Sequence, residues 1–380
     1  MTVAKLKLAC QLAAVRSLLR PMLRWSHRQG DRPGYSIVLG VPWMLRDLLG
    51  VNLDFVRRCD RADLDQIHLV FDRKLQPGGD AFVEKIRRDY HDLPLSFHWH
   101  APAAGRLIER TNNASLFACM NWTLGLTAAR TRYVLLHDFD LYPIAPDYFQ
   151  RLFQTLRDQQ LHFTAYERTH FDGLTDDDNI LGTWSLGIDA DWLRSNFKPV
   201  HCFHAVAPVS GRLRSLDGLT HIETKTDRRA LCTPFEKQEM MHVTNLCSIY
   251  LRYRGGRDFE PAWRLHLLWY LQYLAGDEQP MRQATRIMQA GGSSVIAVDG
   301  PGVDFSNTHV TCGNVARDAV RRMETALHGA VRDEVAEYLQ ASDRFWSRHG
   351  DRATLKDASG RVTWRDAGDK VDTPLPSSTS

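Results

Sequence analysis

The 380-residue sequence predicts an α/β protein with a mainly parallel sheet and a helical C-terminal extension. Three observations favour this fold class. Short apolar runs alternate with helix-like segments between Tyr35 and His137, which is typical of strand–helix units in a parallel, right-handed sheet. Several of these runs end in polar residues. Beyond residue 234 the pattern is mostly helical.

The first half of the sheet is predicted from short apolar runs, each followed by a segment with helical spacing of its apolar residues. These runs lack polar alternation, as expected of strands covered on both faces. The expected strands are 36–41, 67–71, 95–100 and 132–137, and the expected helices are 43–59, 81–92 and 114–130. Three of these strands end in polar residues, namely Asp72, His100 and the pair Asp138 and Asp140. Ligands bind at the carboxyl ends of parallel strands, so we expect a site there.

The second half is less regular. Pro146 would occupy the first position of a helix, where its missing N–H costs nothing. The expected strands are 161–166, 183–188 and 293–298, and the expected helices are 146–160, 190–196, 234–253, 261–274 and a long helix or helix pair over 315–346. Residues 170–178 and 199–229 are expected to be loops, and no internal repeat is seen.

We divide the chain into four parts: a basic N-terminal segment 1–34, a main domain 35–312, a helical region 313–365 and a disordered tail 366–380. The first segment has no acidic residue before Asp31, and its basic residues alternate with leucines up to a break at Pro21. Such an amphipathic helix can lie on an anionic membrane surface. A helix packed on the domain, a frayed tail and a mitochondrial presequence are the alternatives.

Composition excludes several classes of protein. The net charge of +3 is too small for a surface that binds nucleic acid throughout, so we expect no nucleic-acid partner. Seven widely spaced cysteines form neither a disulfide framework nor a zinc-ribbon pattern, which indicates a reducing compartment. No run is apolar enough to span a membrane, and no convincing signal peptide is seen. We therefore expect a cytoplasmic protein, peripheral to a membrane if residues 1–34 bind one.

The segment 133–143 carries the strongest chemical signal. A buried strand delivers two carboxylates, Asp138 and Asp140, to the edge of the sheet. Hard oxygen ligands suit Mg²⁺ or Mn²⁺, and either ion also bridges diphosphate oxygens. Asp138 could instead reach a ribose. Two surface acids in a turn are the plain alternative, since a short Asp-x-Asp pattern is common.

The run from Arg110 to Asp140 resembles glycosyltransferases of the GT-A fold, in which a helix with a Gly turn precedes an apolar strand and an Asp-x-Asp motif. Gly125 stands where that family has its glycine. The chain has Thr123 where the large family 2 often has Asn. The stretch Thr131 to Val134, followed by Asp138 to Pro143, is also similar to glucuronyltransferases of the matriglycan-building type. The resemblance covers roughly residues 35–193 and implies a metal-dependent transfer from a nucleotide sugar, with a UDP-sugar favoured, to a glycan or lipid-linked acceptor.

The resemblance assigns further roles. It places Asp72 at the nucleobase or ribose and Arg110 at the base or the diphosphate, whereas a strand-end turn and a solvated charge are the ordinary explanations. Many such enzymes use a late His as a third metal ligand, and His309 is the candidate here.

Inverting transfer needs a general base for the acceptor hydroxyl. The carboxylates downstream of Asp140 that we considered are Asp189, Asp191, Glu236 and Glu239. Asp189 ranks first because it follows a predicted strand, and Glu239 ranks second. A first-turn helix acid explains Asp191, and a solvated helix face explains the two glutamates.

Three rival interpretations remain open. A zinc site could use His98, His100, His201 and His204, although no Cys pair supports it. A haloacid-dehalogenase-like phosphatase would use Asp138 as nucleophile and Asp140 as acid/base, but that motif usually opens its domain. A nucleotide-sugar-binding scaffold without catalysis would keep the fold alone.

Overall fold

The structure is a computed structural model that describes residues 3–350, apart from 74–75, 112, 257–262 and 307. The predicted tail 366–380 therefore lies outside the described residues. The chain divides into two compact units, residues 1–49 with 56–239 and residues 50–55 with 240–380. Within the described ranges, every helix is too short or too polar to cross a bilayer.

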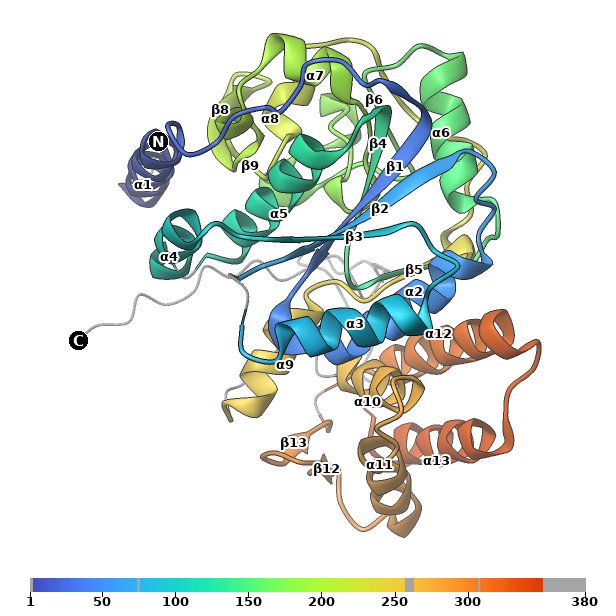
Figure 1. The fold of residues 1–380 in the computed structure, drawn as a ribbon. Helices are drawn as coiled ribbons and strands as arrows, with labels where there is room; N and C mark the ends of the chain where they lie inside the picture. The colour runs from blue at the N-terminus through green and yellow to red at the C-terminus, as the bar shows by residue number, and fades with distance from the viewer. Residues whose placement is uncertain (1–2, 74–75, 112, 257–262, 307, 351–380) are drawn as a thin grey trace. The chain divides into compact units, whose positions relative to one another are not determined.

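Secondary structure in the first 165 residues alternates between strands and helices (Figure 1). The elements are α1 (Val3–Leu19), β1 (Arg32–Val41), η1 (Trp43–Leu48), α2 (Leu49–Arg58), β2 (Leu64–Phe71), α3 (Gly79–Asp89), β3 (Leu95–Trp99), α4 (Pro102–Thr111), α5 (Ala114–Ala128), β4 (Thr131–His137), β5 (Leu141–Pro143), α6 (Tyr148–Asp158) and β6 (Phe163–Ala165).

Shorter elements follow up to residue 242. They are η2 (Phe171–Gly173), η3 (Asp176–Asp178), η4 (Thr183–Ser185), β7 (Gly187–Asp189), α7 (Ala190–Asn196), η5 (Pro199–Cys202), β8 (Ala205–Val209), β9 (Arg212–Leu216), α8 (Thr220–Glu223), β10 (Arg229–Leu231), η6 (Lys237–Glu239) and β11 (Met240–His242).

The central sheet has seven strands in the order β10-β6-β7-β4-β1-β2-β3. Neighbouring strands pair in parallel except on both sides of β7, which is antiparallel to β4 and to β6. Six of the seven strands therefore run in one direction. The predicted mainly parallel sheet flanked by helices is confirmed, and it is the architecture that the resemblance implies.

The register of the parallel strands brings their polar ends to one edge. Phe71, the last residue of β2, pairs with Val41 of β1 and with Trp99 of β3. On the other side of β1, Leu39 pairs with His137, the last residue of β4. Asp72, His100 and Asp138 each follow one of these strand ends, as the sequence predicted.

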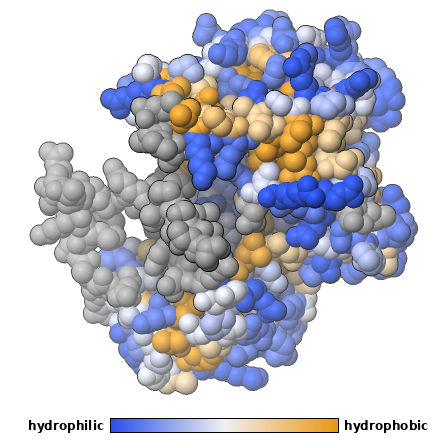
Figure 2. All heavy atoms as spheres, turned by 90° about the vertical axis from the view of Figure 1, so that its left-hand side faces the viewer, coloured by the Kyte–Doolittle hydropathy of each residue, from blue (hydrophilic) through white to orange (hydrophobic). Residues whose placement is uncertain are grey.

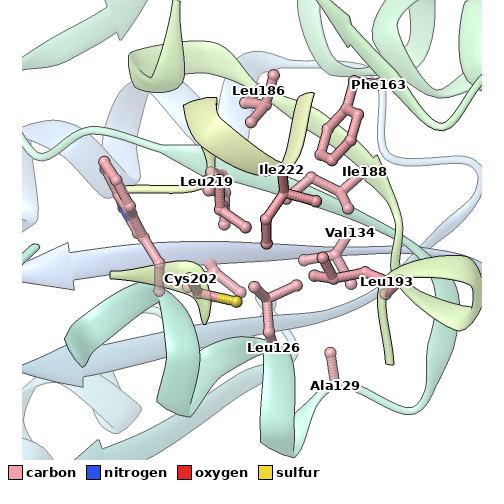
Figure 3. Close-up of a cluster of buried hydrophobic side chains, with 14 of the residues drawn as sticks. Leu126, Ala129, Val134, Phe163, Leu186, Ile188, Leu193, Cys202, Leu219 and Ile222 are labelled. Atoms are coloured by element: carbon pink, nitrogen blue, oxygen red, sulfur yellow. The ribbon is translucent and has the colours of Figure 1, made fainter. Parts of the chain in front are cut away.

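Both faces of β4 are covered, which explains why its sequence is apolar without alternation. Val134 and Leu136 belong to a buried cluster with Leu126 of α5, Leu193 of α7 and Ile222 of α8, and Figure 3 shows side chains of this cluster turned toward one another. The odd-numbered residues of β4 face α6. Tyr133 stacks edge-on against Phe153, and His137 against Phe149.

Helix α5 lies against β1 at Gly125. A Cβ at this position would overlap both methyl groups of Val38, which is fully buried. The glycine that the resemblance singles out therefore allows the close approach of α5 to the sheet.

The described part of the second unit is mostly helical between residues 246 and 349. Its elements are α9 (Leu246–Arg254), α10 (Arg264–Leu274), α11 (Gln279–Ala290), β12 (Val295–Ile296), β13 (Val303–Asp304), α12 (Val310–His328) and α13 (Asp333–His349). His266 lies at the centre of its aromatic core, with rings of Trp269, Phe305, Phe345 and Trp346 around it. The expected helix pair near the C-terminus is confirmed by α12 and α13.

Several element predictions were wrong. The segment 234–253 is η6, β11 and α9 instead of one helix, and 43–59 is divided into η1 and α2. The loop 199–229 contains the antiparallel hairpin β8–β9, and α4 and α11 were not predicted. Pro146 lies before the N-cap residue Asp147 and not inside α6. Apart from α4 and α11, which are helices of ordinary length, these errors fall where short elements leave too few residues for a periodic pattern.

Candidate metal and nucleotide site

The two carboxylates of the Asp-x-Asp motif lie in a tight turn after β4. The N–H of Asp138 donates to the carbonyl of Trp184 at 3.1 Å, which extends the edge of the sheet by one residue. The carbonyl of Asp138 then accepts the N–H of Leu141 at 3.2 Å, so the chain reverses within three residues and enters β5. This turn holds Asp138 and Asp140 at the sheet edge with their side chains partly exposed.

His242 supplies a third ligand atom beside the two carboxylates. Strand β11, which ends at His242, pairs with β5. The residue before this strand, Glu239, accepts the backbone N–H groups of Ile144 at 2.8 Å and Ala145 at 2.9 Å. One ligand atom each from Asp138, Asp140 and His242 lies within 4.8 Å of the other two. Two carboxylate oxygens and one imidazole nitrogen form a donor set that fits Mn²⁺ or Mg²⁺.

The choice of His309 as third metal ligand is not supported. His309 is the N-cap of α12, and its Nδ1 lies 2.8 Å from Thr311 Oγ1 and accepts the Thr311 N–H at 3.3 Å. Among the described residues, His309 belongs to no group of three His, Cys, Asp or Glu side chains that could hold a metal ion, and Asp138, Asp140 and His242 form the one such group. The sequence signal for His242 was weak, because the apolar run Met240–Val243 was absorbed into the predicted helix.

Asp72 lies at the expected edge and is held by the backbone after β1. Its Oδ1 accepts the N–H of Trp43 at 2.9 Å, and its own N–H donates to Val41 at 3.1 Å. Burial raises the pKa of the Asp72 carboxyl, against the opposing effect of the Trp43 hydrogen bond. Asp72 therefore stabilises the turn at the end of its strand, as the ordinary explanation of this residue expected. The turn lies at the same edge of the sheet as Asp138.

An aromatic cluster that was not predicted from the sequence surrounds this turn. The Trp43 ring contacts Phe71, Phe82 and Trp99 at centroid distances of 5.3–5.8 Å, and the Arg46 guanidinium lies 4.4 Å from the Trp43 ring. Trp43 and Trp99 are partly exposed. Flat apolar rings at the carboxyl edge offer stacking surface for a planar base.

His100, the third polar strand end, has a structural partner. Its Nε2 lies 2.7 Å from Asn121 Oδ1 of α5, and both residues are buried. Burial lowers the pKa of the His100 imidazole to about 4, so the ring is neutral at pH 7. His100 thus joins β3 to α5.

Arg110 lies in the last turn of α4 and is exposed. Because α4 begins directly after β3, it starts from the carboxyl edge of the sheet. This placement is compatible with a contact to an anionic ligand, and it is equally what a solvated surface arginine shows.

Asp189 is not at the predicted edge. Strand β7 runs antiparallel to β4, and Asp189 pairs with Tyr133, near the start of β4, while Asp138 follows the end of β4. The Asp189 carboxylate caps α7 by accepting the Trp192 N–H at 3.1 Å, and it pairs with Arg132 at 2.8 Å. Asp189 therefore stabilises the opposite edge of the sheet, and the expectation that it acts as the general base is withdrawn.

The other carboxylates have different surroundings. Asp191 accepts the Gly30 N–H at 2.7 Å, near the same edge as Asp189. Glu239 lies beside the segment that follows β5, and its carboxylate accepts Arg151 and the Glu236 N–H, both at 3.0 Å. Of the candidates considered, Glu239 has backbone hydrogen bonds closest in sequence to Asp140.

The proposed histidine zinc site is not assembled. His98 Nε2 lies 3.0 Å from His68 Nδ1, whereas His100 contacts Asn121 and His204 contacts Ser215 at 2.7 Å. The fourth histidine, His201, accepts the Lys198 N–H at 3.2 Å through its Nδ1. The four histidines thus have separate partners, and they do not form a cluster of ligands in the described part of the chain.

Comparisons with known proteins give remote similarities. No family model matches the chain, and no curated protein matches its sequence. Solved structures that resemble it include a mannosyltransferase from Pyrobaculum calidifontis in complex with GDP-Man and Mn²⁺, with 13% identity, a TM-score of 0.40, and 89% of this chain and 84% of that chain covered. S. aureus TarS 1–349 has 11% identity and a TM-score of 0.38, with coverages of 87% and 97%.

The galactosyltransferase LgtC, solved with donor and acceptor sugar analogues, has 15% identity and a TM-score of 0.33, with coverages of 43% and 60%. Two of these structures are named as glycosyltransferases, and TarS 1–349 has also been solved in complex with UDP-GlcNAc. At these low scores the likeness decides nothing by itself, and the fold of this chain follows from its own strand order and register.

Proposed function

We propose that the chain is a metal-dependent glycosyltransferase that moves a sugar from a nucleotide-sugar donor to a glycan or lipid-linked acceptor. The observation that carries the proposal is the grouping of Asp138, Asp140 and His242 after the central strand β4. Two carboxylates and an imidazole would hold Mn²⁺ or Mg²⁺. The bound ion would neutralise the diphosphate of the leaving nucleotide.

The neighbouring groups support the binding of a nucleotide. The cluster of Trp43, Phe71 and Trp99 provides ring surface for a base, and Asp72 fixes the backbone of Trp43 beside it. We propose that Asp138 and Arg110 also contact the donor, through a ribose hydroxyl or the diphosphate. Forked guanidinium donors match phosphate oxygens well. A UDP-sugar remains the favoured donor.

Inversion at the anomeric carbon would require one direct displacement. The bond from the anomeric carbon to the diphosphate oxygen breaks, the bond to the acceptor oxygen forms, and a carboxylate takes the hydroxyl proton. We propose Glu239 for that role in place of Asp189, because its backbone is bonded to the segment following Asp140. The ion pair with Arg151 would have to open or shift for the carboxylate to accept a proton.

A thermal-shift and hydrolysis panel tests the proposal. UDP-sugars and GDP-sugars should raise the melting temperature with Mn²⁺ and much less without it, and a matched donor should release free sugar slowly. Asp140→Asn should lose the metal-dependent part of the shift, because the amide removes an anionic ligand. Cleavage of a simple phosphate ester without any sugar donor would favour the phosphatase. Donor binding without turnover on any acceptor would favour the scaffold.

A further inference from the structure

Helix α1 uses one apolar side for packing inside its own unit. Leu12, Leu19 and Leu23 are at most 9% exposed and belong to a buried cluster with Ile108 of α4 and Phe203 after η5. Part of the leucine pattern that predicted a membrane-binding helix is therefore used for packing inside the unit. The side of α1 that carries Leu12 and Leu19 thus agrees with the alternative of a helix packed on the domain.

The outward side of α1 is also largely apolar. Leu6 and Leu18 are 46% and 55% exposed, and Met22, just beyond the helix, is 48% exposed. The exposed positions between Leu6 and Leu18 carry the small residues Cys10 and Ala14. Successive members of this series are four residues apart and therefore lie next to one another on the helix surface. A helix that is apolar on both sides is normally covered on both. Figure 2, which views the molecule from the side of α1, shows hydrophobic surface beside strongly hydrophilic surface.

Positive charge gathers along one flank of this helix. Arg16 and Arg20 are four residues apart on α1 and its end, and η5, which packs against α1, brings Lys198 and His201. The pKa of the His201 imidazole is lowered by burial first and then by the charges of Arg16, Lys198 and Arg20. Lys225 extends the group, since it acts with Arg16 on His221 of α8.

No described carboxylate forms an ion pair with these cations, and residues 1–30 contain no Asp or Glu. By contrast, arginines elsewhere on the same unit, such as Arg57 and Arg151, have carboxylate partners. The flank therefore keeps an unbalanced positive charge beside an exposed apolar strip.

We propose that the α1 docking surface, formed by Leu6, Leu18 and Met22 with Arg20 and Lys198, binds an anionic phospholipid membrane. The exposed apolar side chains would enter the boundary between headgroups and acyl chains. The cations would contact lipid phosphates, and each basic residue near an anionic leaflet adds attraction. The inference does not depend on the proposed glycosyltransferase activity.

A second copy of the chain is a less suitable occupant. A two-fold dimer through this surface would place the same basic flank against itself, and like charges across an interface oppose association. A lipid surface supplies the opposite charge and an apolar layer together.

Vesicle sedimentation with the full chain tests the proposal. The protein should bind vesicles of phosphatidylcholine mixed with phosphatidylglycerol, and bind phosphatidylcholine alone much more weakly, with a loss of binding at high salt. Leu18→Ser with Met22→Ser should weaken binding by about tenfold or more. Leu251→Ser is the matched control, because Leu251 is 52% exposed on α9 and should leave binding unchanged.

The charges are tested by Arg20→Glu with Lys198→Glu, for which we expect a weakening of at least about tenfold. Arg286→Glu, at an exposed position of α11, is the control for a reversed charge. Each variant is first checked for an unchanged melting temperature. Inorganic phosphate is added as a competitor, and release of the protein at low phosphate would indicate a site for soluble phosphate in place of a membrane surface.

Besides release of the protein at low phosphate, three results would overturn the proposal. The first is equal binding to neutral and anionic vesicles. The second is undiminished sedimentation of the Leu18→Ser, Met22→Ser variant. The third is a concentration-dependent dimer of the wild-type chain that this variant abolishes, because the outward side of α1 would then be covered by a second copy.

Discussion

Asp189 lies opposite Tyr133 across the antiparallel strands β7 and β4, and its carboxylate joins Arg132 at 2.8 Å to the first turn of α7. Asp138 follows the other end of β4. Asp138 and Asp189 both come after apolar runs in the sequence. They lie at opposite edges of the sheet because β7 runs antiparallel to β4. The finding turns Asp189 from a candidate for chemistry into a residue that stabilises the fold.

Asp189→Ala should therefore lower stability and leave the proposed chemistry intact. Loss of the helix cap costs about 1 kcal/mol, and the half-exposed ion pair adds less. Asp189→Asn is the matched control, because an Asn side chain still caps a helix. Thermal unfolding should place the Asn variant between the wild type and the Ala variant. A large loss of donor turnover in the fully folded Asn variant would instead restore a catalytic role.

The part of the site that the sequence predicted is the part set by local pattern. Apolar strands ending in Asp72 and Asp138 can be recognised along the chain, and parallel crossovers bring such ends to one edge. Periodicity does not reveal strand direction, so the antiparallel β7 and the true position of Asp189 were missed. Crossover rules apply to parallel units, and β7 is the exception in this sheet.

His242 was missed for a different reason. Its strand has three residues, and its position depends on pairing with β5, about 100 residues earlier in the chain. Such a contact leaves no periodic trace in either segment. His309 was the candidate from the sequence, and its role as a helix cap becomes visible only in the hydrogen bonds with Thr311.

The metal site predicts different effects for these two histidines. His242→Ala should weaken Mn²⁺ binding by about tenfold or more, because one of three protein ligands is lost. His309→Ala should bind Mn²⁺ as the wild type does. Titration calorimetry with Mn²⁺ alone measures both without any sugar donor. Equal affinities in the wild type and the His242→Ala variant would exclude His242 as a ligand.

The close approach of α5 to β1 makes Gly125 sensitive to added volume. Gly125→Ala should destabilise the chain by roughly 1–3 kcal/mol, because the new methyl group meets both methyl groups of the buried Val38. Adding Val38→Ala should recover part of that loss by making room, although Val38→Ala alone leaves a cavity. A double-mutant cycle on melting temperatures measures the coupling. Strictly additive effects would contradict the contact as the cause.

Glu223 predicts a pH dependence of stability. The residue is 0% exposed, and its carboxylate accepts the Leu181 N–H at 2.8 Å. Burial raises the pKa of the Glu223 carboxyl to about 8 from a usual value of 4.5, against the effects of the Leu181 hydrogen bond and Arg229. Between these two values the folded chain keeps a proton that the unfolded chain releases. The stabilisation is thus full below about pH 4.5 and is lost as the pH rises toward about 8.

Glu223→Gln removes this titration and keeps an oxygen that can accept the Leu181 N–H. The variant should be more stable than the wild type near pH 8, by an amount on the order of a few kcal/mol, and the difference should shrink toward pH 5. Glu84→Gln serves as the control, because the Glu84 side chain is 67% exposed. Melting temperatures across this pH range measure the effect. Parallel pH profiles for the wild type and Glu223→Gln would mean that Glu223 titrates normally in the folded chain. A carboxyl with an ordinary pKa has already lost its proton above about pH 6 in both the folded and the unfolded chain. Its titration could therefore not lower the stability further between about pH 6 and pH 8.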